Sequence, residues 1–146
     1  MELSNRAALT GIGETRYAKE SDKSQQALTF EASLSAIEDA GLDPKDIDGV
    51  IPYGLGGIVA EDFITNFGID DLRYSAVIPM GGASAVAALQ CAAMAVSTGV
   101  ATHVLIPLGR DGYSGSRIGS RIGQMPQFKI AAEFEAPVGA NAPAQY

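Results

Sequence analysis

The sequence is short of the residues that build disulfides and metal clusters. It has one cysteine and one histidine among 146 residues, which excludes an internal disulfide and argues against a cysteine–histidine metal site. Basic residues are few as well: ten lysines and arginines stand against seventeen acidic residues, and the net charge of −7 argues against nucleic-acid binding. No apolar run is long enough to span a membrane, and the first residues lack the apolar core of a signal peptide. We therefore expect an acidic, cytoplasmic protein that binds neither membrane nor nucleic acid.

The residues that are present are typical of a globular α/β domain, with 47% hydrophobic and 18% charged side chains. Strand-like and helix-like patterns alternate: we expect strands at 6–12, 49–54, 75–80 and 102–108, and helices at 24–40, 59–67 and 84–97. In the first helix the apolar positions are Ala27, Phe30, Leu34 and Ile37, and Gly41 follows as a stop signal. The alternation predicts a layered, mostly parallel sheet with helices on both faces.

The glycines of the segment Gly11-Ile12-Gly13 have two readings. A dinucleotide-binding turn would need a third glycine where Arg16 stands, and a helix opening directly out of the turn. The favoured reading is a glycine-bent end of a strand that leads into a loop.

A strand-turn-helix at residues 77–99 is the most informative stretch. An apolar strand stops at Gly81 and Gly82, and a helix begins at once. The start of a helix presents free backbone N–H groups, which stabilise an oxyanion or lower the pKa of a thiol. This geometry is typical of a platform for acyl-transfer chemistry.

The segment after Gly109 has a different composition, rich in glycine, serine and arginine. Arg117 and Arg121 belong to a small duplication, Ser-Arg-Ile-Gly, and are candidates for contacts with a phosphate. A loop with solvated charges is the favoured alternative. We expect residues 1–109 to form the α/β domain and residues 110–146 to begin a loop domain in a truncated chain.

Several of these motifs, in this order, resemble the opening of thiolase-superfamily proteins, closest to the sterol-carrier-protein-2 thiolase branch. The resemblance runs from about residue 6 to 110 and is carried by residues 11–15, 30–42, 46–50, 88–96, 99 and 103–106. It implies the amino-terminal half of a fold with two similar α/β halves, and a dimer built around the third strand and helix. It also implies an acyl-CoA thioester as substrate and no further cofactor.

The sequence departs from the family pattern at the nucleophile. Counting back from Gly99 places Gly82 where the resemblance implies the nucleophilic cysteine. Cys91 lies seven residues beyond Ser84, about 10 Å along the helix, and reads as an ordinary half-buried thiol. Ser84 is a candidate catalytic hydroxyl, although a helix N-cap is the favoured alternative. Gly81 and Ala83 complete the predicted substrate-binding corner, whereas His103 is expected in a turn at the opposite end of its strand.

Three functions remain open. A thiolase needs a covalent acyl-enzyme and therefore a thiolate, whereas a retro-aldol cleavage needs only a base and donors for the enolate oxygen. The pattern resembles thiolase-like aldolases that cleave the side chains of steroid-type CoA thioesters, and this implies a small zinc-and-OB-fold partner protein. We rank a carbon–carbon lyase first, an acyltransferase second, and a catalytically silent acyl-CoA-binding or scaffold subunit third; the fragment alone is expected to be inactive.

Overall fold

The computed structural model describes residues 4–53, 57–112 and 134. Its helices are α1 (Gln25–Asp39), α2 (Ala60–Phe67) and α3 (Ser84–Ser97), with short 3-10 turns η1 (Pro44–Asp46) and η2 (Gly81–Ala83). The strands are β1 (Gly49–Val50), β2 (Tyr74–Ser75) and β3 (Val104–Leu105). The contacts divide the chain into two units, residues 1–17 with 23–110 and residues 18–22 with 111–146, and all these elements belong to the first.

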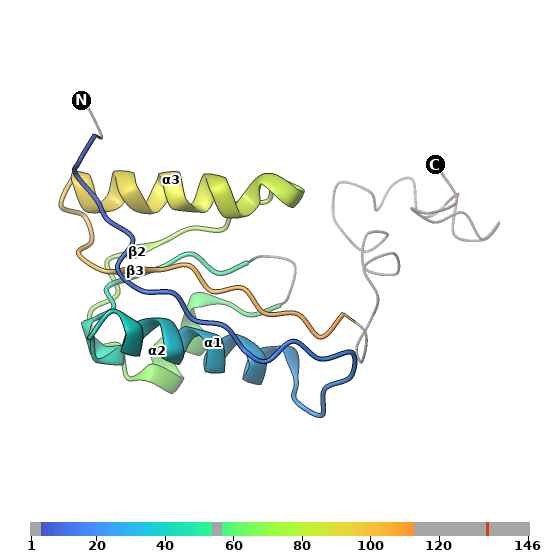
Figure 1. Cartoon of the computed structure of the whole chain (residues 1–146). Coiled ribbons are helices and arrows are strands. Elements are labelled where there is room, and N and C mark those ends of the chain that lie inside the picture. The colour runs from blue at the N-terminus through green and yellow to red at the C-terminus, as the bar shows by residue number, and fades with distance from the viewer. Residues whose placement is uncertain (1–3, 54–56, 113–133, 135–146) are drawn as a thin grey trace. The chain divides into compact units, whose positions relative to one another are not determined.

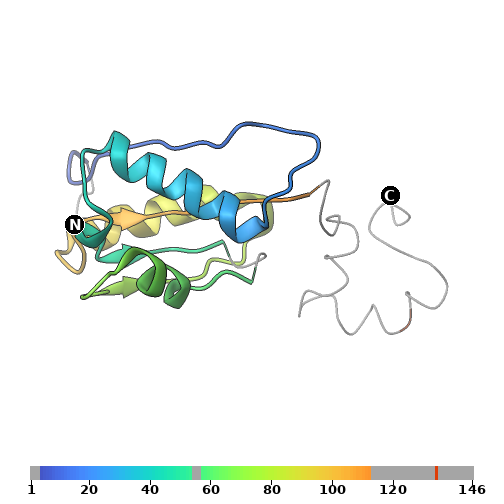
Figure 2. The same ribbon diagram turned by 90° about the horizontal axis from the view of Figure 1, so that it is seen from below.

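The three strands form a parallel sheet in the order β2-β1-β3. Gly49 of β1 stands opposite Tyr74 on one side and Val104 on the other. Figure 1 shows α3 on one face of the sheet, and α1 and α2 on the other. In the view from below, α1 and α2 lie side by side (Figure 2), joined by a 3.3 Å hydrogen bond from Gln26 to Asp62. The predicted α/β class, parallel sheet and helices on both faces are confirmed.

The paired strands are much shorter than the segments 49–54, 75–80 and 102–108 that the sequence predicts. Each segment runs into an isoleucine–proline pair: Ile51-Pro52, Ile78-Pro79 and Ile106-Pro107. Proline has no N–H group to donate to a neighbouring strand, so the ladder cannot continue through it. The pairing therefore ends just past Val50 and Leu105, where the N–H of Ile51 donates to the Leu105 carbonyl at 2.9 Å.

The predicted strand at residues 6–12 is wrong: the described part of this segment joins no strand and is extended along α1. A Cβ atom at Gly11 would lie 2.1 Å from the Ala36 carbonyl oxygen, and one at Gly13 would lie 2.1 Å from that of Ala32. The Ile12 N–H donates to Asp39 at 2.9 Å. The two glycines therefore allow the chain to pass directly against the backbone of α1. This packing explains the glycine motif without dinucleotide binding.

Helix α1 begins and ends where its sequence predicts, and its predicted apolar face is buried in part, through Ile37 and the half-buried Phe30. The Ser24 hydroxyl accepts from the Ala27 N–H at the start, and Gly41 adopts a φ of 70° beyond the end. Its buried positions are Thr29, Ser33 and Ile37, whereas the predicted Ala27 and Leu34 are exposed. The Thr29 and Ser33 hydroxyls donate to carbonyl oxygens four residues earlier (2.8 and 2.7 Å), so both can be buried without an unsatisfied group.

The core lies between the sheet and the pair α1–α2. Phe30, Phe63 and Phe67 meet edge to face with ring centroids 5.1–5.4 Å apart, and Phe63 and Val50 have no exposed surface. Helix α3 packs on the other face through small side chains, among them Ala88 and Ala95. Within the described ranges, no helix has the length and apolar character needed to cross a membrane.

Candidate functional site

The glycine turn lies directly before α3 as the sequence predicts, but it is the 3-10 turn η2, and β2 ends at Ser75, before the predicted strand end. Gly81 has a φ of 59°, in the left-handed region that favours glycine. Gly82 has no such constraint, and a Cβ atom added to it would meet nothing within 4 Å. The described residues offer no hydrogen-bond acceptor to the N–H groups of Gly81 and Gly82, whereas the Ala83 N–H donates to the Met80 carbonyl at 3.2 Å. Two backbone donors are therefore open at this corner.

Ser84 is the first residue of α3 and not its N-cap, which is Ala83. The predicted N-cap role is therefore wrong in its details. The Ser84 hydroxyl does accept a backbone N–H, but from Met80, four residues earlier, at 3.0 Å. The side chain is buried, at 5% exposure, because it folds back across the turn. Ser84 thus fixes the loop that carries Gly81 and Gly82.

A small apolar cavity, open to solvent and with a volume of about 30 Å³, lies where the strand segments run past the sheet. Its lining comes from the three isoleucine–proline segments and the first turns of α3: Ile51, Pro52, Tyr53, Ile78, Ser84, Ala85, Ala88, Ile106, Pro107 and Leu108. In open parallel sheets, ligands bind at the carboxyl ends of the strands. Ser84, predicted as a site residue, lines this cavity two residues after Gly82.

Tyr53 is a site residue that the sequence reasoning missed. It follows Pro52 at the end of β1 and lines both the apolar cavity and a second hollow of about 10 Å³, shared with Thr29, Ile58 and Gly109. The Arg110 guanidinium carbon lies 5.9 Å from the centre of the Tyr53 ring, within cation–π range. The isoleucine–proline pair repeated in three strand segments is a signal that could have found it, because the residues beyond these pairs gather at one edge.

The remaining candidate residues from the sequence lie away from the glycine turn or outside the described residues. Arg117 and Arg121, the predicted phosphate contacts, lie outside the described residues. Cys91 is half-buried on α3, as predicted, and lies near Tyr74. Burial, and next the nearby Cys91 thiol, raises the pKa of Tyr74. This pair is at the first residue of β2, away from the glycine turn.

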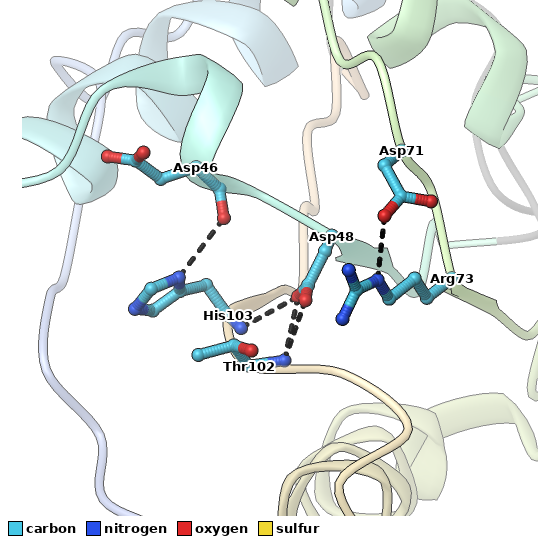
Figure 3. A network of polar contacts seen from close by, with 6 residues as sticks. All are labelled: Asp46, Asp48, Asp71, Arg73, Thr102 and His103. Carbon is cyan, nitrogen blue, oxygen red and sulfur yellow. Dashed lines mark hydrogen bonds and ion pairs between the residues drawn. The ribbon is translucent and has the colours of Figure 1, made fainter.

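The amino ends of the strands carry a polar network around Asp48 (Figure 3). The Asp48 carboxylate accepts the N–H of Thr102 at 2.8 and 2.9 Å and that of His103 at 2.8 Å. Its backbone carbonyl accepts the N–H groups of Arg73 and Tyr74 at 2.8 and 3.1 Å. Asp48 therefore joins the starts of all three strands.

His103 belongs to this network, at the start of β3 as the sequence predicts. Its Nδ1 atom lies 3.1 Å from the Asp46 carbonyl oxygen, which accepts a hydrogen bond from this nitrogen when the nitrogen carries the proton. Arg73 pairs nearby with Asp71 at 2.8 Å on the surface, and this partner raises the pKa of Arg73. In the part of the chain that the structure describes, no three histidine, cysteine or acidic side chains gather in a way that would hold a metal ion.

Comparison with known proteins was made over the whole chain. No family model matches it. It is 37% identical over 148 residues to a protein of Thermomonospora curvata named steroid side-chain-cleaving aldolase, an alignment that covers 99% of this chain and 38% of that protein. It is 40% identical over 117 residues to the 17-hydroxy-3-oxo-4-pregnene-20-carboxyl-CoA lyase of Mycobacterium tuberculosis, covering 80% of this chain and 30% of that protein.

A solved structure agrees with these likenesses. The chain superposes on one described as an Ltp2-ChsH2(DUF35) aldolase with a TM-score of 0.78 and 36% identity, over 94% of this chain and 35% of that chain. The present chain thus spans between 30% and 38% of the length of these proteins. These three proteins are named as aldolases and a lyase, whereas a shorter stretch of 43 residues is 51% identical to a β-ketoacyl-(acyl-carrier-protein) synthase III of Staphylococcus haemolyticus, over 30% of this chain and 13% of that protein.

Proposed function

We propose that this chain is the amino-terminal part of a thiolase-like aldolase that cleaves a carbon–carbon bond in the side chain of a steroid-type CoA thioester. The reaction is a retro-aldol cleavage that proceeds without a covalent acyl-enzyme. The proposal places the chain in the thiolase superfamily, in the aldolase group rather than with the cysteine-dependent thiolases. The names of the two sequence relatives and of the superposed structure support this choice.

The observation that carries the proposal is the open space at Gly82. Nothing in the local structure requires glycine there, because the backbone is unstrained and a Cβ atom would meet no neighbour within 4 Å. The resemblance puts a nucleophilic cysteine at this position. Its absence leaves room beside the free N–H groups of Gly81 and Gly82, where a substrate oxygen can be received.

The chemistry follows from this arrangement. A base removes the proton of the β-hydroxyl group, the oxygen becomes a carbonyl, and the bond between the α and β carbons breaks. The electron pair of that bond passes to the thioester oxygen, which becomes an enolate oxygen. Backbone N–H donors aimed at that oxygen stabilise it, and removal of one such donor typically costs about 100- to 1,000-fold in rate. The enolate then takes a proton at its α carbon.

The apolar cavity favours an apolar substituent on the substrate, and its volume of about 30 Å³ holds only a small part of one. Its lining residues include Tyr53 and Ser84 among aliphatic and proline side chains. A fused hydrocarbon ring system gains free energy by leaving water, at about 25 cal/mol per Å² of apolar surface. The lyase relative is named for a pregnene carboxyl-CoA compound, which combines such a ring system with a thioester.

Two alternatives make different predictions. A cysteine-independent acyltransferase would thiolyse a β-ketoacyl-CoA, and a silent acyl-CoA-binding subunit would turn over neither substrate. The test is to incubate the complete protein, at the length of its relatives, with a β-hydroxyacyl-CoA, and separately with a β-ketoacyl-CoA plus free CoA. We expect cleavage of the first only. Thiolysis of the second would contradict the proposal, and binding without turnover would favour the silent subunit.

A cysteine variant sharpens this test. Gly82→Cys should fold normally, because its Cβ atom enters open space, but the thiol should occupy the place of the substrate oxygen. We expect aldol cleavage to fall by about 100-fold. Ser35→Cys, on the exposed surface of α1, is the matched control for a new thiol. Equal activity of the two variants would argue that the open space at Gly82 has no role.

The assembly is part of the same proposal. We propose a homodimer through the third predicted strand and α3, because α3 has no charged residue and leaves Val86 and Leu89 exposed at 72% and 46%. We also propose a second, smaller subunit of the zinc-and-OB-fold kind. The superposed structure supports it, since its description names ChsH2(DUF35) beside Ltp2.

A further inference from the structure

We infer that Arg110, seated on the ring of Tyr53, contacts a phosphate group of the CoA part of the substrate. The inference rests on the proposed function for the identity of the ligand, but the arrangement that suggests it is independent of Gly82. It assigns a binding role to two residues at the edge of the sheet opposite the Asp48 network.

The first step is the position of Tyr53. Its side chain is half-buried and lines both hollows at the end of β1, so it forms a partition between them. Pro52 fixes the backbone on one side of Tyr53 and is itself buried. A ring held in this way is a rigid support for a group that lies on it.

The second step is the placement of Arg110. The guanidinium lies over the Tyr53 ring at 5.9 Å and, within the described ranges, forms no ion pair with a carboxylate. The chain carries seventeen acidic residues against ten basic ones, so a carboxylate partner is not scarce in general. Arg73, at the other end of the sheet, forms an ion pair with the Asp71 carboxylate. Arg110 is instead exposed, with its positive charge available to a ligand.

The third step is the chemistry of the pair. A guanidinium that lies over a ring at the outer limit of cation–π distance still has its N–H groups free to donate in parallel to a phosphate or carboxylate. The adjoining cavity is apolar and suits the acyl chain rather than a charged group. A CoA thioester combines both features, since a diphosphate and a further phosphate are joined through pantetheine to the acyl carbon. Arg110 at the rim and the apolar lining beyond it therefore match the two chemically different parts of one ligand.

The test compares ligands with and without phosphate. Titration calorimetry on the complete protein gives the Kd of coenzyme A and of pantetheine, which lacks every phosphate. We expect Arg110→Gln to raise the Kd of coenzyme A about tenfold and to leave that of pantetheine unchanged. Arg110→Lys keeps the charge but loses the planar guanidinium, and its Kd for coenzyme A should lie between those of the unmodified protein and Arg110→Gln. Tyr53→Leu should raise the Kd of coenzyme A by a smaller factor than Arg110→Gln does.

Arg73→Gln is the matched control, since it removes an arginine at the opposite end of the sheet and should change neither Kd. Equal effects of Arg110→Gln on both ligands, or no effect on either, would overturn the inference. Because binding is measured without turnover, failure of aldol cleavage with a preserved difference between the two ligands would refute the proposed reaction and leave the phosphate contact standing.

Discussion

At the amino end of the sheet, Asp48 holds the strand starts together, whereas at the carboxyl end each strand segment runs into a proline. The carboxylate and carbonyl of Asp48 receive N–H groups from β3 and β2, and no side-chain polar atom buried within the described residues lacks a partner. At the other end, two glycine N–H groups and an arginine are left without protein acceptors or acids, again among the residues described.

This difference separates stability from binding. A satisfied polar network gains nothing from a ligand, because its donors and acceptors are already used. Donors left open beside an apolar cavity are costly to the isolated chain and become useful when a ligand supplies the acceptor. His103, the single histidine, belongs to the first kind of site, and Tyr53 belongs to the second. A titratable side chain is therefore weak evidence of function until its end of the sheet is known.

The largest expected effect is at the amino end. Asp48→Ala leaves the N–H groups of Thr102 and His103 without their acceptor. Hydrogen bonds to a charged group are worth about 1.5–3 kcal/mol each, so we expect a loss of roughly 2–4 kcal/mol in the free energy of unfolding. Urea denaturation followed by circular dichroism measures it.

Asp48→Asn keeps one acceptor oxygen and should lose clearly less stability than Asp48→Ala. Asp71→Ala is the control, because it removes a carboxylate of the same end that pairs only on the surface, and its urea midpoint should not move. If Asp48→Ala and Asp71→Ala behaved alike, the network would not join the strands as the geometry indicates.

The local elements were largely predictable from the sequence. The helices α1 and α3 and the parallel order of the sheet follow from apolar spacing, glycine stops and alternation, and the predicted bounds of α3 are those observed. The prediction of a strand at residues 6–12 was wrong because an apolar pattern does not show whether the segment packs against a strand or a helix. Its glycines fit the close approach to Ala32 and Ala36, which depends on tertiary contact.

The site was predictable only in part. The glycine turn at residues 81–82 was found because a strand end, a glycine pair and a helix start are consecutive in sequence. Tyr53 and Arg110 were missed because 57 residues separate them, and only the parallel sheet brings the ends of β1 and β3 to one edge. The buried face of α1 was predicted only in part: Ile37 lies in the core as expected, whereas Thr29 and Ser33 were missed because they are polar and donate their hydroxyl protons within the helix.

The glycine turn gives a second test with a smaller expected effect, in which substitutions at the adjacent residues Gly81 and Gly82 change the stability in opposite directions. Gly81→Ala forces a side chain into a φ of 59° and should destabilise the protein by about 1–2 kcal/mol. Gly82→Ala meets neither strain nor a clash, and the lower entropy of the unfolded chain should stabilise it by about 0.4–1 kcal/mol. Thermal unfolding of both variants measures the difference. A destabilised Gly82→Ala would mean that the fold, and not the substrate, requires this glycine.

The smallest effect is expected from Tyr74, at the amino end. Burial, followed by the nearby Cys91 thiol, raises its pKa above the ordinary value of about 10. The folded state therefore holds this proton at a pH where the unfolded state has lost it. The contribution to stability is complete below pH 10 and declines as pH rises through the higher folded value.

Urea midpoints between pH 8 and 11 should thus fall less steeply in Tyr74→Phe than in the unmodified protein. Tyr53→Phe, at the carboxyl end, is the control and should keep the steeper fall. If both variants lost the same part of the slope, the alkaline response would not belong to the Tyr74–Cys91 pair.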